Sequence, residues 1–243
     1  MLIDIVRNSN NIVFFGGAGV STESNIPDFR SEKGLLKAKE VYGHPPEHLL
    51  SYGFFLHNPK KFFSYYKDNL IYSDALPNAA HLALAKMEEM GKVSAVITQN
   101  IDGLHQAAGS KNVIELHGSN YRHYCMDCKE TYSLSYVLDD VNGVDLIPRC
   151  KECEGIVRPD VVLYGESLDE DVMIKAIDAI FEADCIIVGG TSLAVYPAAG
   201  LLQYFRGNKR VLINKGETPY DSSADLVIND SIGKVLGEII TKL

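Results

Sequence analysis

The chain has 243 residues and a mass of 26.8 kDa, which is enough for one large domain or for a large domain with a smaller companion. Hydrophobic residues make up 46% and charged residues 23%, a composition that excludes intrinsic disorder. The net charge of -9 argues against sequence-independent binding to nucleic acid, because neutralising phosphates requires a clustered basic surface.

The first residues lack the basic and apolar regions of a secretory signal, and no apolar run approaches the roughly 20 residues of a membrane-spanning helix. We therefore expect a cytoplasmic protein with no membrane partner and no specific nucleic-acid partner.

The first predicted strand, Asn11 to Phe15, runs into a glycine turn, Gly16 to Gly19, and then into a helix start. Glycines at such a turn let the backbone approach a phosphate, and a helix N-terminus favours its negative charge. The ordinary dinucleotide pattern G-x-G-x-x-G is incomplete, because Thr22 occupies the third glycine position, and the expected second strand with an acidic end is missing. The turn therefore predicts a phosphate site but leaves a purely structural turn open.

A polar stretch with a proline, Ile26-Pro27-Asp28-Phe29-Arg30, follows the turn. Arg30 has the chemistry to hold a phosphate, and Phe29 could cover an aromatic ring or a cationic intermediate. The plain alternative is a loop with a surface arginine and a core phenylalanine. Residues 31–76 then predict short helices around prolines, with an aromatic core, as a helical insertion.

The central predicted strand, Val93 to Ile97, follows a helix from about Asn78 to Met90 and ends at Thr98-Gln99-Asn100-Ile101-Asp102. A second apolar run, Val113 to Leu116, delivers His117. Ligands of open α/β sheets bind at the carboxyl ends of strands. The sequence therefore predicts an amide, a carboxylate and an imidazole at one edge of the sheet.

Strands and helices alternate again in the last third of the chain. The predicted elements are a helix from Asp169 to Ala183, a strand from Cys185 to Val188 with a second glycine turn at Gly189-Gly190-Thr191-Ser192, a helix opened by Pro197, and strands at Val211–Asn214 and Leu226–Ile228. This alternation predicts an α/β fold with a doubly wound parallel (Rossmann-like) sheet, and the insertions predict a smaller lobe.

Two cysteine pairs, Cys125-x-x-Cys128 and Cys150-x-x-Cys153, can supply four thiolates to one tetrahedral ion. A four-thiolate zinc site is closed, so its role should be structural. Two disulfides are the alternative, which a cytoplasmic location disfavours. The surrounding residues 119–159 include five basic and seven acidic residues, which disfavours a phosphate-binding zinc ribbon. Cys185 lies in an apolar run and is predicted to be a small core residue.

Taken together and in this order, these motifs resemble those of the sirtuins, the NAD-dependent protein deacylases, over nearly the whole chain. The motifs that carry the resemblance are Gly17-Ala18-Gly19-Val20-Ser21, Ile26 to Arg30, Thr98 to His105, Leu116-His117-Gly118, the two cysteine pairs, Arg158-Pro159-Asp160, Tyr164-Gly165-Glu166 and Gly190-Thr191-Ser192-Leu193. The resemblance implies an NAD-binding Rossmann-like domain from residues 1–30, 77–118 and 159–243. It also implies a small domain from the helical insertion 31–76 and the zinc-binding insertion 119–158.

The activity that the resemblance implies is NAD-dependent lysine deacetylation of the bacterial type, with NAD as co-substrate and zinc as a structural ion. In that reaction the amide oxygen of acetyl-lysine attacks the NAD ribose, nicotinamide leaves, and deacetylated lysine and O-acetyl-ADP-ribose form. The protein has to position the reactants and exclude water, so it needs no serine or cysteine nucleophile.

The resemblance also assigns residues. His117, Asn100 and Asp102 form the catalytic set, with His117 as the base that activates a ribose hydroxyl, a task that suits an ordinary imidazole pKa of about 6.5. The residues expected to bind NAD are Ala18, Gly19, Thr22, Phe29, Arg30, Gln99, Asn100, Ile101, Asp102, His117, Thr191, Ser192, Asn214 and Ile232. Val162, Tyr164 and Val195 are expected to line the acyl-lysine tunnel or to pair with the peptide backbone.

Two positions depart from family patterns. Asn25 stands where the family usually has glycine, and asparagine tolerates a left-handed backbone better than most residues. Sirtuins that prefer succinyl groups carry Tyr-x-x-Arg, whereas this chain has Tyr65 followed by Asp68. A carboxylate there would repel an acidic acyl group, so we expect acetyl-lysine or other neutral acyl-lysines as partners.

Three alternatives stay open. Protein mono-ADP-ribosylation and NAD hydrolysis share the first chemical step with deacetylation. A dehydrogenase is disfavoured, because the ordinary fingerprint and a ribose-binding acid are absent. A zinc-ribbon module that only senses NAD is the non-catalytic alternative.

Overall fold

The computed structural model describes residues 1–28 and 31–243, and its centre is a six-stranded sheet in which every neighbouring pair is parallel. The strands are β1 (Ile12–Gly16), β2 (Val93–Thr98), β3 (Val113–Glu115), β9 (Cys185–Gly189), β10 (Lys209–Ile213) and β11 (Leu226–Ile228). Their order is β11-β10-β9-β1-β2-β3, so the chain reverses direction across the sheet between β1 and β9. This order is that of the doubly wound dinucleotide-binding fold, which confirms the predicted fold class.

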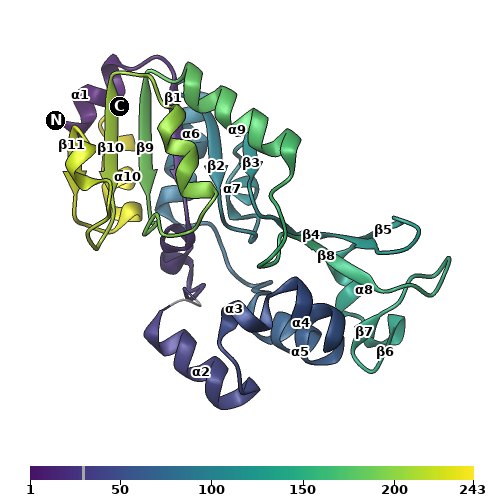
Figure 1. Ribbon diagram of the computed structural model, residues 1–243. Helices are drawn as coiled ribbons and strands as arrows, with labels where there is room; N and C mark the ends of the chain where they lie inside the picture. The colour runs from purple at the N-terminus through teal and green to yellow at the C-terminus, as the bar shows by residue number, and fades with distance from the viewer. Residues whose placement is uncertain (29–30) are drawn as a thin grey trace.

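Helices cover both faces of this sheet (Figure 1). One face packs against α1 (Leu2–Asn8), α6 (Ala79–Glu89) and α10 (Ile232–Ile240), and the other against α9 (Glu170–Glu182) and the 3-10 helix η3 (Ala198–Tyr204). Side chains alternate along β1, because successive strand residues point to opposite faces. Phe14 therefore enters the first core and Phe15 the second. Both cores are built mainly from apolar side chains, and Cys185 lies in the first, as predicted, whereas His105 is buried beside Phe14.

A second group of elements projects from the carboxyl edge of the sheet (Figure 1). We call it the small lobe. Its helices are α2 (Glu32–Tyr42), α3 (Pro46–Leu49), α4 (Tyr52–His57) and α5 (Pro59–Asn69). Its second part is an antiparallel sheet of order β5-β4-β8, made of β4 (Gly118–Cys125), β5 (Thr131–Ser133) and β8 (Val157–Val161). Smaller elements there are α8 (Leu134–Leu138), η2 (Asp140–Asn142), β6 (Gly143–Val144) and β7 (Ile147–Pro148).

Aromatic side chains form the core of the small lobe. Phe55, Phe62 and Phe63 are buried and meet edge to face, with ring centroids 4.9 to 6.1 Å apart. This geometry is the favoured one for aromatic pairs. Val161 and Leu163, which lead back toward the parallel sheet, belong to the same cluster, so the lobe packs against the segment that borders the cleft described below.

Two neighbouring strands, β4 and β8, connect the parallel sheet to the part of the small lobe that carries the four cysteines. Gly118 opens β4 and pairs with Val161 at the end of β8. Its φ of 77° lies in the left-handed region, and a Cβ added there would overlap the carbonyl oxygen of Asp160. Only glycine fits this position without strain.

The remaining elements are η1 (Ala18–Ser24), α7 (Leu104–Ala107) and η4 (Asp221–Ser223). The predicted helices after Gly19 and Pro197 are 3-10 helices, and Asn25 ends the first of them with a left-handed φ of 61°. The sequence analysis did not anticipate α1 or α10. Among the described residues, no helix is long and apolar enough to cross a membrane.

Candidate active site

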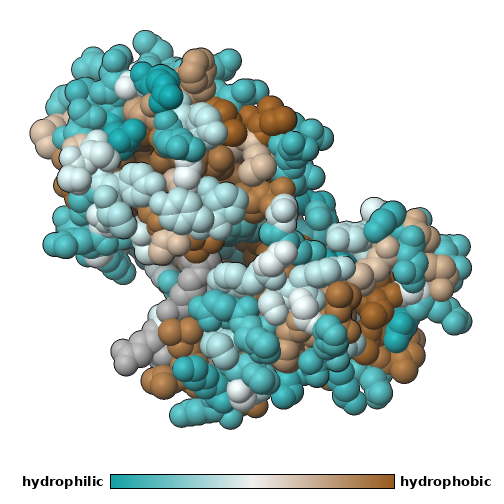
Figure 2. All heavy atoms as spheres, viewed as in Figure 1, coloured by the Kyte–Doolittle hydropathy of each residue, from teal (hydrophilic) through white to brown (hydrophobic). Residues whose placement is uncertain are grey.

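A cleft of about 410 Å³ lies between the carboxyl ends of β1, β2 and β9 and the small lobe. In Figure 2 the molecule narrows between the part that contains the parallel sheet and the small lobe. The lining of the cleft comes from η1, from the segment after β2, from His117, from the segment after β8 and from the turn after β9. The cleft therefore sits at the point where the strand order reverses, which is where doubly wound sheets bind ligands.

The two predicted glycine turns lie side by side at one end of the cleft. The N–H of Gly19 donates to the carbonyl of Gly190 over 2.8 Å, and the N–H of Gly17 donates to Gly189 over 3.3 Å. A Cβ on Gly19 would stand 2.8 Å from the Cα of Gly190, so the two backbones touch without intervening side chains. Ala18, Gly19 and Gly190 line the cleft and offer it main-chain surface, as a pyrophosphate requires.

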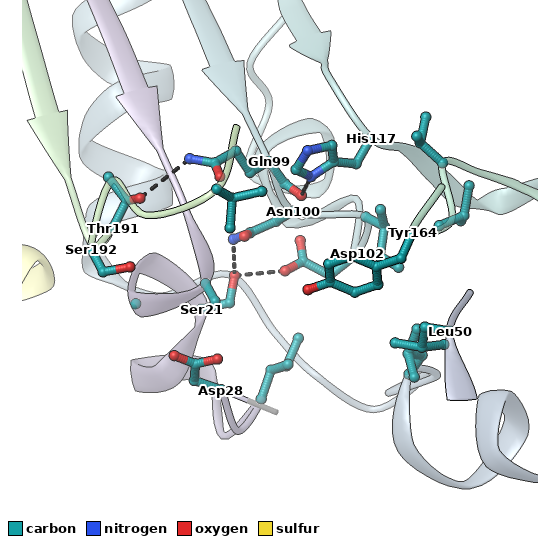
Figure 3. A pocket seen from close by; sticks show the side chains of 18 of the residues that line it. Ser21, Asp28, Leu50, Gln99, Asn100, Asp102, His117, Tyr164, Thr191 and Ser192 are labelled. Carbon is teal, nitrogen blue, oxygen red and sulfur yellow. Dashed lines mark hydrogen bonds between the residues drawn. The ribbon is translucent and has the colours of Figure 1, made fainter. Parts of the chain in front are cut away.

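Gln99 connects the end of β2 to the second glycine turn. Its side-chain amide donates to Thr191 Oγ1 over 3.3 Å, and the same oxygen accepts the N–H of Leu193 over 3.2 Å (Figure 3). Ser192 and Asn214 line the same end of the cleft. Amide and hydroxyl groups of residues that were expected to bind NAD are therefore gathered at this end of the cleft.

A hydroxyl joins the two polar side chains at the base of the cleft. Ser21 Oγ donates to Asp102 Oδ2 over 2.6 Å and accepts from Asn100 Nδ2 over 3.0 Å (Figure 3). The other carboxylate oxygen of Asp102 accepts the N–H of Leu104, the first residue of α7, over 3.0 Å. Burial raises the pKa of the Asp102 carboxyl above its ordinary value, and these two hydrogen bonds oppose that rise.

His117 enters the cleft from the residue before β4. Its Nδ1 lies 2.9 Å from the carbonyl oxygen of Gln99, which can only accept a hydrogen bond. Nδ1 therefore carries the proton, and in the neutral ring the lone pair is on Nε2. This tautomer allows Nε2 to act as a base, because it can take up a proton.

The segment after β8 forms the wall of the cleft next to the small lobe. The N–H of Val162 donates to His117 O, and Tyr164 exchanges two main-chain hydrogen bonds of 3.0 Å with Leu50 and Tyr52. These groups are satisfied within the chain, so Val162 and Tyr164 can contribute side chains rather than these N–H groups to a ligand. Val195 also lines the cleft.

The cleft gathers 13 of the residues that the sequence analysis proposed for it. They are Ala18, Gly19, Gln99, Asn100, Ile101, Asp102, His117, Val162, Tyr164, Thr191, Ser192, Val195 and Asn214. Phe29 and Arg30 lie outside the described residues.

Two further proposed residues are placed elsewhere. The hydroxyl of Thr22 donates to Gly19 O within its own 3-10 turn, and neither Thr22 nor Ile232 is among the described lining residues. The Ile232 side chain is buried in the first core, beside Gly189, because it occupies the first turn of an apolar helix face.

The sequence analysis missed Ser21 and the small-lobe residues Leu50, Leu70 and Tyr72, which also line the cleft. Ser21 is the last residue of the glycine motif and the first polar side chain after its glycines. That position could have identified it as a cleft residue. The other three come from the helical insertion, where no periodicity distinguishes a cleft residue from a core residue.

The position of Asp68 differs from the expectation that its charge faces the acyl group. Asp68 accepts a 2.6 Å hydrogen bond from the Tyr42 hydroxyl, and Tyr65 is buried in the aromatic core. The described cleft lining includes Asn69, Leu70 and Tyr72 from this part of the chain but neither Tyr65 nor Asp68. The position of Asp68 therefore gives no support to the expected repulsion of an acidic acyl group.

The four predicted metal ligands are brought together at the far end of the antiparallel sheet. The Sγ atoms of Cys125, Cys128, Cys150 and Cys153 all lie within 4.8 Å of one another, and none forms a disulfide. The sulfur pairs 125/153 and 128/150 are 3.4 and 3.5 Å apart, close to the ~3.8 Å edge of a regular tetrahedron with zinc–sulfur bonds of about 2.3 Å. The cluster fits a structural zinc ion, and these cysteines are not among the described residues that line the cleft.

Comparison with known proteins follows the same motifs. The sequence model of the Sir2 family matches residues 17–197. An NAD-dependent protein deacetylase of Clostridium acetobutylicum is 61% identical over 236 residues, covering 97% of this chain and 95% of the relative. A protein of the same name from Clostridium tetani is 57% identical over 242 residues, covering 100% and 97%.

Solved structures agree with this result. A Sir2 structure with a deacetylated p53 peptide and 3'-O-acetyl ADP ribose has a TM-score of 0.90 at 38% identity, covering 99% of this chain and 96% of that chain. A Sir2 structure bound to an acetylated peptide has a TM-score of 0.86 at 37% identity, with coverage of 99% and 96%.

Proposed function

Because the chain belongs to the Sir2 family and is an NAD-dependent protein deacetylase, we propose that its cleft binds NAD beside the glycine turns and an acyl-lysine beside the small lobe. The observation that carries this assignment is the convergence of His117, Asn100 and Asp102 on one cleft with both glycine turns. We also propose the division into an NAD-binding domain (1–30, 77–118 and 159–243) and a small domain (31–76 and 119–158). Its support is the parallel sheet, whose strands all lie in the first set.

The amide oxygen of acetyl-lysine bonds to the ribose carbon as the bond from that carbon to nicotinamide breaks. The acetyl group then passes to a ribose hydroxyl, the amide C–N bond breaks with the consumption of one water, and deacetylated lysine and O-acetyl-ADP-ribose are the products. The nucleophile belongs to the substrate, so the protein contributes position, exclusion of water and proton management. The walls from Leu50, Leu70 and Val162 are apolar and suit the exclusion of water.

We propose a task for each of the main polar groups at the base and the glycine-turn end of the cleft. His117 Nε2 takes the proton from a ribose hydroxyl, because Nδ1 is committed to the Gln99 carbonyl. Asp102 and Asn100, held by Ser21, orient the nicotinamide carboxamide. The Gln99 amide and Thr191 hydroxyl bind the ribose side, and the glycine backbones bind the pyrophosphate. Phe29, Arg30, Thr22 and Ile232 keep their proposed cofactor contacts only as expectations from the family.

Acetyl-lysine and other neutral acyl-lysines are the substrates that we propose. Three cleft side chains near the small lobe, Leu50, Leu70 and Leu163, are apolar and would leave an acyl carboxylate without a charged partner. We therefore expect desuccinylation at least about 10-fold slower than deacetylation at equal peptide concentrations. Faster removal of succinyl than of acetyl groups, measured by chromatography of the peptides, would refute this assignment.

A structural zinc ion in the four-cysteine cluster would fix the turn after β4 against the turn before β8. We propose a cytoplasmic location, because zinc thiolate sites and unpaired cysteines such as Cys185 are typical of reducing compartments.

The decisive experiment is mass spectrometry of the small-molecule products after incubation with NAD and an acetyl-lysine peptide. Wild-type protein should give nicotinamide and O-acetyl-ADP-ribose, and His117→Ala should reduce the rate about 10²- to 10⁴-fold. His57→Ala is the matched control, because His57 is exposed, its Nδ1 lies 2.7 Å from the Gly53 carbonyl oxygen of its own helix, and it is not among the described residues that line the cleft. Free ADP-ribose or ADP-ribosylated protein with an untouched peptide would instead establish NAD hydrolysis or transfer.

A further inference from the structure

An arginine is buried directly behind the cleft wall that we assign to the acyl-lysine. Arg158, in β8, is 3% exposed and forms a two-pronged ion pair with Glu166. Its Nη1 donates to Oε1 over 2.7 Å, and its Nη2 donates to Oε2 over 2.8 Å. This parallel geometry is the most directional that an arginine and a carboxylate can adopt.

Aromatic rings from two parts of the small lobe enclose the guanidinium. Its Cζ lies 5.3 Å from the Phe55 ring centroid and 5.7 Å from those of Tyr52 and Tyr124. Tyr52 and Phe55 belong to α4, whereas Tyr124 belongs to β4. The cation therefore packs against the helical and the zinc-bearing parts of the lobe at once.

Both members of the pair also bond to the backbone of the cleft wall. Arg158 Nη2 donates to Val161 O over 2.9 Å, and Glu166 Oε2 accepts the N–H of Leu163 over 2.9 Å. The wall is fastened on its other side by Tyr164, which exchanges hydrogen bonds with Leu50 and Tyr52. The path of the backbone from Val161 to Glu166 thus depends on the ion pair.

We propose that Arg158 and Glu166 are positioning residues that set the affinity for the acylated peptide by fixing the wall from Val162 to Gly165. The proposal rests on the proposed function of the cleft. Arg158 packs against rings of the small lobe, and Glu166 lines the cleft in the wall that we assign to the peptide, so loss of the pair should act on the peptide and spare NAD. An isolated buried charge is also costly, so each partner requires the other.

The test compares steady-state kinetics of Glu166→Gln and Arg158→Lys with wild type, varying acetyl peptide and NAD separately. Each variant should raise the KM for the peptide about 10-fold or more while the KM for NAD stays within about twofold. Hydrogen exchange at the amides of residues 161–166 should become faster in both. Lys67→Gln is the matched control, because it removes another small-lobe ion pair, with Asp140, and should leave both KM values unchanged.

A double variant, Arg158→Met with Glu166→Leu, separates positioning from stability. Apolar replacement of a buried pair can preserve stability, yet it removes the bonds to Val161 and Leu163. The melting temperature of the double variant should approach that of wild type while its KM for the peptide stays raised. If a single variant does not fold, the double variant alone tests whether the ion pair positions the wall.

A wild-type peptide KM in the folded double variant, or an equal rise of both KM values, would overturn the proposal. Failure of wild-type protein to deacetylate any peptide would instead refute the proposed function.

Discussion

Replacing Ser21 with alanine should weaken the use of NAD much more than it weakens folding. The Ser21 hydroxyl donates a hydrogen bond to Asp102 over 2.6 Å and accepts one from Asn100 over 3.0 Å, so its removal breaks both bonds. A hydrogen bond to a charged group contributes about 1.5–3 kcal/mol. Taking about 2 kcal/mol, we expect kcat/KM for NAD to fall about 30-fold in Ser21→Ala.

The same substitution should change the pH dependence in a defined direction. The Ser21 hydroxyl lowers the pKa of Asp102 against the effect of burial, so its removal raises that pKa further. Asp102 would then ionise only at higher pH. The acidic limb of the pH profile of kcat/KM for NAD should therefore shift to higher pH.

The assay is nicotinamide release at saturating acetyl peptide, with NAD and pH varied. Ser24→Ala is the matched control, since Ser24 is buried in the same 3-10 helix but accepts from Asn78 and lies outside the cleft lining. Equal kcat/KM values for the two variants, with no shift of the acidic limb for Ser21→Ala, would refute the reasoning.

Three further predictions concern stability. Gly118→Ala should lower the free energy of unfolding by more than about 2 kcal/mol in urea titration, because a left-handed φ and the Asp160 carbonyl both exclude a Cβ. Burial lowers the pKa of His81 to about 4 and that of His105 to about 3, so the unfolded chain takes up protons first as pH falls below about 6.5. Stability should therefore fall between pH 7 and pH 5 by about 2 kcal/mol for each histidine, and His105→Phe should reduce that slope in urea titrations at the two pH values. Purified protein should contain about one zinc ion per chain by metal analysis, and chelation should lower the melting temperature by about 10 °C or more; an unchanged melting temperature in the metal-free protein would contradict a structural role.

Much of the cleft could be predicted from the sequence because its polar residues directly follow apolar runs. Gln99, Asn100 and Asp102 come after β2, and His117 comes after the run that forms β3. The carboxyl ends of parallel strands share one edge of a sheet, so local sequence order was enough to bring these groups together. The cysteine cluster was likewise local, since each pair occupies one turn.

Other features depend on which strands become neighbours, and periodicity does not encode that choice. Ser21 and Asp102 are 81 positions apart and meet because β1 pairs with β2. The burial of Arg158 depends on rings from α4 and β4, which the sequence pattern does not connect. The place of Ile232 could not be predicted either, because an apolar residue at a helix start can face a cofactor or the core, and its side chain here packs over Gly189.

The contact between the two glycine turns has a consequence for how this protein can evolve. Gly19 and Gly190 are far apart in the sequence, yet each occupies the space that a side chain on the other would need. If recombination replaced the segment that carries one turn and left the other in place, the two turns would not have been selected to fit each other. The two turns should therefore be inherited as one unit, and a change in one should be tolerated only beside a compensating change in the other.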